Sequence, residues 1–222
     1  MVPKGVLDCI PSEKWCLDAL EAARANLPEA IFNHSLRVYL IARWLAKREP
    51  NHDLDGPDSL PLVFAAAIFH DIGACELYNG KQRFEVEGAD AAAAHLEANG
   101  VSKSDSHRVW TAIALHTSPG IAERIDPLTR LIRVAVKIDF SSEQRALYKA
   151  EDLSWEIEQH LPRLDIERVL AKAVVDQAEK IPKSIDRTTW LDSDKHPSSS
   201  WPGILLRAHI ENPDCDGVNP AF

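Results

Sequence analysis

The sequence has no hydrophobic run long enough to cross a bilayer as a helix. Its longest unbroken apolar stretch, residues 62–69, falls far short of the roughly 20 residues that a span requires. The N-terminal segment MVPKGVLDCI has neither the charged nor the apolar region of a secretion signal. Only four cysteines are present, scattered and without a CxxC pair, which is typical of reduced thiols. We therefore expect a cytoplasmic protein with no membrane partner.

Positive charge is also in short supply. The chain has 25 Lys and Arg against 34 Asp and Glu, which gives a formal net charge of -9. Affinity for nucleic acid comes mainly from neutralising phosphates, so this balance argues against a nucleic-acid partner. It equally disfavours an acidic membrane surface. The expected partner is a small-molecule substrate, and the sequence leaves open whether the chain forms a homo-oligomer.

Strand patterns are missing too, because no segment alternates apolar and polar residues convincingly. The dominant apolar period is helical, and 222 residues with 45% hydrophobic content can bury one ordinary core. The expected fold class is therefore all-α, a bundle of about seven or eight helices. These helices are expected at about residues 13–26, 28–47, 61–70, 88–98, 102–116, 126–140, 154–161 and 165–180.

Beyond Ile181, prolines and serines interrupt the helical pattern. We expect residues 1–180 to form the helical bundle and residues 181–222 to form an irregular C-terminal extension of the same domain. The segment WPGILLRAHI predicts one short helix in that extension. Because Trp190, Trp201 and Phe222 give it more aromatic surface than a solvated tail carries, it should pack on the bundle.

Four polar residues break the apolar pattern of the helices. His34 lies on a buried stripe, His70 and Asp71 end the most apolar helix, and Asp139 lies on another buried stripe. Alone, each suits a hydrogen-bonded core histidine or a helix cap. Together, two carboxylates and two imidazoles on buried faces need a common partner, because an unpaired buried carboxylate is destabilising. A divalent metal ion with an open coordination position fits that donor set.

The chain resembles the HD-domain superfamily of metal-dependent hydrolases in FNHSLRVYLIARWLA, AAAIFHDIG and LIRVAVKIDF. In that family the first His, the His-Asp pair and the last Asp bind a divalent metal inside an all-α bundle. The resemblance therefore implies His34, His70, Asp71 and Asp139 as metal ligands. It also implies an HD-domain helical bundle as the fold.

More locally, the chain looks like the cyanamide-hydratase-like branch of that superfamily. The similar phrases are NLPEAIFNHSLRVY, KQRFEVEGADAA, AIALHTSPGIA and the tail WPGILLRAHIENPDCDGVNPAF. The activity for which the branch is named is the zinc-dependent hydration of cyanamide to urea. This resemblance implies a hydratase with one divalent ion, zinc first, with iron or manganese as alternatives.

The number of metal ions depends on the remaining histidines. Dinuclear HD proteins typically carry a further His before a Gly-Ala helix start, and in FEVEGA Phe84 holds that place. This favours one ion over two. His95 lies roughly 110° off the apolar stripe of its helix and is read as a solvated or flanking residue. His116 ends a helix at the edge of a buried face, where either a structural role or a contact beside the metal is reasonable.

The implied chemistry assigns catalytic roles to Asp71 and His116. A bound divalent ion lowers the pKa of its water from 15.7 to about 7 in favourable zinc sites, and a proton must then reach the substrate nitrogen. Asp71 is the first candidate to carry it and His116 the second. Nearby aromatic residues could wall a small apolar pocket or belong to the ordinary core: Phe69, Phe84, Trp110 and Phe140.

Two rival functions remain open. An HD-type phosphohydrolase acting on a nucleotide or another small phosphate ester would need cations near the motifs. The candidates for that role are Arg37, Lys81, Arg83, Arg108 and Lys137, although no Gly-rich phosphate loop is present. A noncatalytic HD binding protein is disfavoured, since a scaffold need not keep four polar groups buried.

Overall fold

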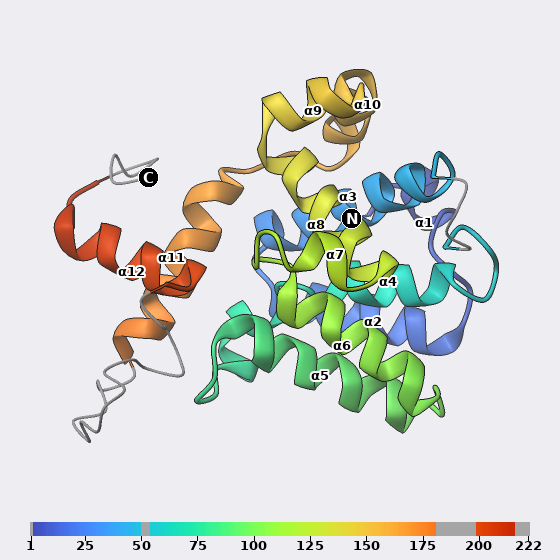
Figure 1. Cartoon of the computed structure of the whole chain (residues 1–222), viewed down its shortest axis with the longest axis horizontal. Helices are drawn as coiled ribbons and strands as arrows, with labels where there is room; N and C mark the ends of the chain where they lie inside the picture. Colours follow the sequence, from blue (N-terminus) through green and yellow to red (C-terminus); the bar gives the residue numbers. More distant parts are fainter. Residues whose placement is uncertain (1, 50–53, 181–198, 216–222) are drawn as a thin grey trace.

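The computed structural model describes residues 2–49, 54–180 and 199–215. Within these ranges the chain contains helices and no strand, which confirms the predicted all-α fold (Figure 1). The helices are α1 (Lys4–Leu7), α2 (Lys14–Asn26), α3 (Glu29–Ala46), α4 (Leu60–Phe69), α5 (Phe84–Ala98), α6 (Lys103–Leu115), α7 (Ala122–Ile125), α8 (Pro127–Phe140), α9 (Ser142–Tyr148), α10 (Glu151–His160), α11 (Ile166–Lys180) and α12 (Trp201–Glu211). Short 3-10 helices, η1 (Ile72–Ala74) and η2 (Glu76–Tyr78), follow α4.

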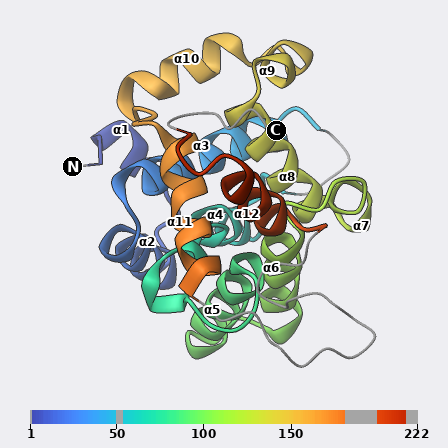
Figure 2. The same cartoon turned by 90° about the vertical axis from the view of Figure 1, so that its left-hand side faces the viewer.

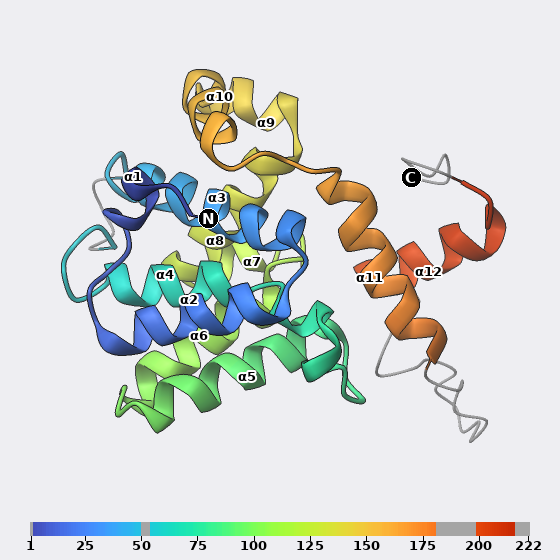
Figure 3. The same cartoon turned by 180° about the vertical axis from the view of Figure 1, so that it is seen from behind.

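Helices α3 and α4 form the centre of the bundle. As its apolar sequence predicts, α4 is buried along its length from Pro61 to Phe69. It packs against α3 on one side and against α2 and α6 on others, while α8 covers α3. Figure 3 shows α2 in front of this centre and the α5–α6 pair along one edge. The bundle therefore places the last turn of α4 deep in the core.

Most helix limits lie close to their predicted positions because the caps are encoded locally. The Ser102 hydroxyl accepts the Asp105 N–H at the start of α6. The Asp126 carboxylate accepts the N–H groups of Leu128 and Thr129 at the start of α8. Three further helices, α1, α7 and α9, were not expected from the sequence, since four to seven residues are too few to show a period.

Helix α5 begins at Phe84, four residues before the predicted start at Gly88. The additional turn forms because Phe84 and Glu85 are both buried against the bundle. It brings the backbone of α5 against η1, where Gly73 and Gly88 face each other. A Cβ on Gly88 would lie 3.1 Å from the Gly73 nitrogen. The segment after His70 and Asp71 is thus fixed by a close backbone contact.

We expect Gly73→Ala to destabilise the chain by about 3 kcal/mol. The added Cβ would lie 1.9 Å from the Phe84 carbonyl oxygen and 2.7 Å from the Gly88 nitrogen, and neither backbone atom can rotate away. Urea unfolding followed by circular dichroism measures the change. Gly5→Ala is the control, because a Cβ added there would meet nothing within 4 Å and alanine favours a helix. Equal stability of the two variants would contradict the close contact.

Helix α11 packs against α3 and η1 and α12 packs on α11, so both helices lie in front of the bundle in the view of Figure 2. Gln177 fixes α11 to the bundle by donating to the carbonyl oxygens of Gly73 and Cys75, at 2.9 and 3.2 Å. The predicted helix in WPGILLRAHI is present as α12, and its Trp201 ring lies 5.9 Å from the Phe84 ring. Trp190 and Phe222 lie outside the described residues, so the extent of the C-terminal extension stays a prediction.

None of the helices in the described ranges is long and apolar enough to span a membrane.

Candidate metal centre

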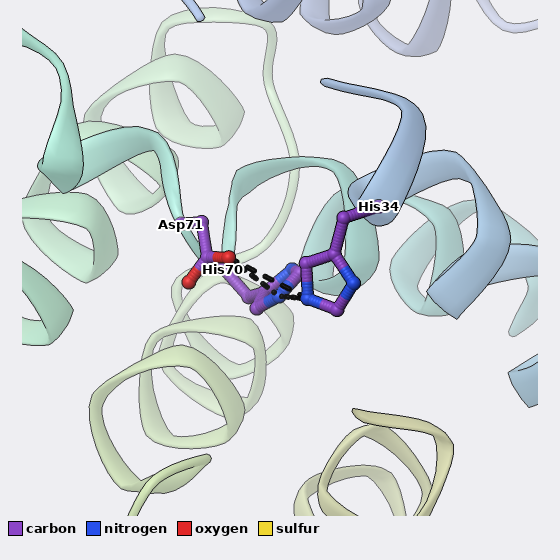
Figure 4. A group of neighbouring side chains, drawn as sticks. All are labelled: His34, His70 and Asp71. Carbon is purple, nitrogen blue, oxygen red and sulfur yellow. Dashed lines mark hydrogen bonds and ion pairs between the residues drawn. The ribbon is translucent and has the colours of Figure 1, made fainter. Parts of the chain in front are cut away.

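Three of the four predicted metal ligands meet at the end of α4. His34 comes from α3, and His70 and Asp71 directly follow the last residue of α4. The His34 and His70 Nε2 atoms are 3.1 Å apart, and Asp71 Oδ2 lies 3.2 Å from the second and 3.6 Å from the first (Figure 4). All three side chains are buried. We call these three residues the ligand cluster.

The Nδ1 atom of each ligand histidine faces a hydrogen-bond acceptor. His34 Nδ1 lies 2.7 Å from a carboxylate oxygen of Asp139, and His70 Nδ1 lies 2.7 Å from the Ala67 carbonyl oxygen. Neither oxygen can donate, so in the neutral imidazoles Nδ1 carries the proton in each case. The two Nε2 atoms therefore turn lone pairs toward each other and toward Asp71.

The convergence of these lone pairs calls for a cation. Asp71 Oδ2 is buried and has no hydrogen-bond partner, although two imidazole nitrogens face it. Ligands in a tetrahedral shell with metal–nitrogen bonds of about 2.0–2.1 Å lie roughly 3.3 Å apart. The observed separations of 3.1 to 3.6 Å bracket that value. Two nitrogen donors and a carboxylate thus fit a divalent transition metal.

The pKa shifts of these three groups indicate how charge is distributed in the ligand cluster. Burial lowers the pKa of His34. Burial is also the largest single influence on His70, but the charge and hydrogen bond of Asp71, with the Ala67 carbonyl, together outweigh it and raise the pKa. Burial opposes ionisation of Asp71, yet His70 and His116 hold its pKa well below the usual range. Asp71 is therefore the anionic centre of the ligand cluster.

The fourth predicted ligand, Asp139, lies behind His34 instead of within the ligand cluster. Both of its carboxylate oxygens accept hydrogen bonds from Arg37, each at 2.8 Å, and Oδ2 also faces His34 Nδ1. Burial opposes its ionisation, but Arg37 and His34 hold its pKa well below the usual range. Its role as a ligand stays a prediction, and this geometry favours orientation of His34.

His116 stands next to the ligand cluster at the end of α6. Its Nδ1 lies 2.6 Å from the Ile113 carbonyl oxygen, and its Nε2 lies 3.5 Å from Asp71 Oδ1. Arg133 donates to the His116 carbonyl oxygen at 3.0 Å. With Nδ1 protonated, Nε2 presents a lone pair beside the carboxylate. The structure therefore brings both predicted catalytic residues together.

A buried polar network that the sequence did not reveal follows His116. The fully buried Glu85 carboxylate accepts the Thr117 hydroxyl at 2.5 Å and an Arg83 N–H at 3.0 Å. No sequence signal marked Glu85, because the predicted helix began only at Gly88. The network pairs the charge of Arg83 with that of Glu85 and holds the turn after His116 in place.

A cavity of about 910 Å³ opens from the ligand cluster. His34, His70, Asp71 and His116 line it, together with residues of α8, α11 and α12. Of the aromatic residues considered from the sequence, Phe140 lines the cavity and packs on His34 with ring centroids 4.6 Å apart. The ring centroids of Phe84 and His116 lie 5.8 Å apart. Phe69 belongs to the buried core, and the indole N–H of Trp110 donates to the Asp90 carboxylate.

Four of the five cations considered for a phosphate do not line this cavity. Arg37 is fully buried and bonded to Asp139, and Arg83 is bonded to Glu85. Arg108 pairs with Asp105, and Lys81 is exposed in the loop before α5. Lys137 alone of the five lines the cavity.

We expect His95→Ala to leave metal content and turnover unchanged. His95 Nε2 lies 2.8 Å from the Trp15 carbonyl oxygen, and the ring packs against Phe69 at 5.3 Å. These contacts join α5 to its neighbours and fit the predicted flanking role. Metal analysis by mass spectrometry is the measurement. Loss of half the bound metal in the variant would instead indicate a dinuclear centre.

An all-α bundle with a buried His, His-Asp cluster defines a class of helical metal-binding proteins. The HD domain family matches residues 31–191, well over half of the chain. The chain belongs to the HD domain family. Proteins of this family are generally metal-dependent hydrolases, which gives the broad class of this chain. Among curated proteins, none matches it.

Proposed function

We propose that the chain is a hydratase of small nitrile-type substrates such as cyanamide, with one divalent ion held by His34, His70 and Asp71. The observation that carries the metal-dependent class is the buried convergence of two imidazole lone pairs on an unpartnered carboxylate oxygen. Zinc is the first candidate for the ion, and iron or manganese are the alternatives. The cyanamide-hydratase-like resemblance supplies the substrate class.

The surroundings of the ligand cluster support a neutral reacting group. Phe140 packs on His34, and Phe84 packs on His116. The nearby guanidinium of Arg37 is bonded to Asp139, and its remaining N–H groups reach the carbonyl oxygens of Leu161 and Pro162. Aromatic walls beside a guanidinium that is already bonded suit an uncharged nitrile better than a phosphoryl group.

The divalent ion, when bound, supplies a Lewis acid that makes water acidic enough to react at neutral pH. Hydration adds the water oxygen to the nitrile carbon and moves protons to the nitrile nitrogen. Asp71 would take a proton from water, and its Oδ1, which points away from His34 and His70 in Figure 4, supports this role. His116 Nε2, 3.5 Å from that oxygen, can accept the proton and deliver it to nitrogen.

We expect His116→Ala to lower turnover by about 10²–10⁴-fold, the usual contribution of a general acid or base. Metal content should stay at the wild-type level, because His116 faces Asp71 from outside the ligand cluster. Turnover and metal analysis on the same preparation give both values. A fully active variant would assign His116 a structural role at the end of α6.

A phosphohydrolase is the second candidate, because four cationic side chains, Arg133, Lys137, Arg168 and Lys172, line the cavity. The deciding experiment loads the chain with zinc, iron or manganese in turn. It then measures urea formation from cyanamide and phosphate release from p-nitrophenyl phosphate and nucleoside monophosphates. Chelator-sensitive urea formation supports the hydratase, and phosphate release supports the rival. Neither product with metal bound would favour a noncatalytic HD binding protein.

A further inference from the structure

The cavity is much larger than a nitrile such as cyanamide needs. Its volume of about 910 Å³ is near the upper end of the roughly 300–1,000 Å³ that is usual for small-molecule sites. Helices α8, α11 and α12 supply most of its wall. A substrate that uses this space has a body extending from the ligand cluster along those helices.

That wall is largely apolar. Phe140 comes from the last turn of α8, and Trp201 begins α12. The apolar side chains that helices α8, α11 and α12 contribute are Val136, Phe140, Leu170, Ala171, Val175, Trp201, Ile204 and Leu205. Such a surface binds a hydrocarbon or aromatic body by removing it from water.

Lys137 differs from the other cations of the cavity wall. Arg133 pairs with Glu123, Arg168 with Asp165, and Lys172 with Asp176. Lys137 is a half-buried residue, and its ammonium makes no hydrogen bond or ion pair with any residue in the described ranges. An ammonium has three donors and no acceptor, so a partly desolvated one favours an anionic partner.

The charge of the cavity wall is opposite to that of the chain. The sequence carries a net charge of -9, yet the cavity is lined by four Lys and Arg against three carboxylates, Asp71, Glu167 and Asp176. A divalent ion at the ligand cluster would add to this positive charge. The positive excess of the wall is small by itself, and with the divalent ion it favours an anionic ligand.

We propose that the substrate is an amphiphilic anion whose apolar body lies against α11 and α12 and whose anionic head group binds Lys137. The nature of the reacting end of this molecule rests on the proposed function, whereas its apolar body and anionic head group do not. Cyanamide then corresponds only to the reacting group of the substrate. A carboxylate and a phosphate monoester share the chemistry that Lys137 would recognise.

The test compares three probes of equal chain length, hexanoate, hexyl phosphate and the neutral hexanamide, by calorimetric titration of the metal-loaded full chain. We expect at least one anion to bind about tenfold more tightly than hexanamide, the usual worth of a hydrogen bond to a charged group. Lys137→Gln should remove this preference. The probe that loses most affinity identifies the head group as carboxylate or phosphate.

Two variants separate the role of Lys137 from general effects. Lys172→Gln removes the same charge from a cavity lysine that already pairs with Asp176, and it should keep the preference. Lys137→Arg should keep it also, and circular dichroism shows whether each variant is folded. Equal binding of anions and amide, binding of no probe, or equal losses in Lys137→Gln and Lys172→Gln would overturn the proposal. Absence of urea and phosphate formation alongside a Lys137-dependent preference would reject only the proposed function.

Discussion

Replacing Asp71 with alanine is expected to remove the bound metal and to lower turnover by at least about 10³-fold. General acid–base assistance alone is worth about 10²–10⁴-fold, and the variant also loses the anionic ligand. Asp71 Oδ2 faces both ligand histidines, while Oδ1 faces His116. One carboxylate therefore joins the metal-binding and proton-transfer halves of the site.

The measurements are metal per chain by mass spectrometry and turnover of whichever substrate the deciding experiment identifies. Asp58→Ala is the matched control, because Asp58 is an exposed carboxylate just before α4. It should retain both metal and turnover. Wild-type metal content in Asp71→Ala, with turnover lost, would restrict Asp71 to proton transfer. Wild-type values for both would refute the metal site.

The positions of the ligand cluster could be predicted because its residues violate the helical pattern. A polar side chain on the buried stripe of α3 or at the end of fully buried α4 is recognisable without coordinates. The order of His34 and the His70–Asp71 pair then matches the family. Periodicity gives the face of each helix, and in these helices the face is enough to place the side chain in the core.

The partners of Asp139 could not be predicted in the same way. Periodicity places Asp139 on a buried face but does not say which side of His34 it approaches. Arg37, which is three residues after His34, was considered as a phosphate contact, and in the structure it binds Asp139 from the interior. The Glu85 network joins residues 32 positions apart, so the residue pattern of a single helix does not reveal it. Side-chain pairing across elements depends on tertiary packing that local patterns do not encode.

We expect Arg37→Met to lower the free energy of unfolding by about 3–5 kcal/mol. Methionine has a similar length, but it leaves the buried Asp139 carboxylate without its cation, and breaking a buried pair carries a penalty of this size. Two carbonyl oxygens, of Leu161 and Pro162, lose a donor as well. Urea unfolding measures the change. The control Arg130→Met breaks a partly exposed pair with Glu49 and should cost only about 0–1 kcal/mol.

A second substitution tests whether the unpaired charge causes the loss. Asparagine at position 139 keeps the size of Asp139 and removes its charge. Arg37→Met combined with Asp139→Asn should therefore recover part of the stability that Arg37→Met alone loses. By itself, Asp139→Asn should weaken metal binding about 10–100-fold, as expected when the partner of a ligand histidine is changed. Complete loss of metal in that variant would instead support Asp139 as a direct ligand.

The stability difference between wild type and Arg37→Met should depend on pH. Arg37 and His34 hold the pKa of Asp139 well below its usual range in the folded chain. A depressed pKa in the folded state contributes stability above the unfolded pKa of about 3.9, and that contribution is lost as the pH falls below it. Both unfolded chains titrate alike, so the difference should shrink as the pH falls through the pKa of Asp139 in the folded variant, and it should be smaller at about pH 4 than at about pH 8. Unfolding is measured with chelator present, so that acid release of metal does not enter. A difference that stays constant into the acid range would show that Arg37 stabilises the bundle by packing, with its charge contributing little.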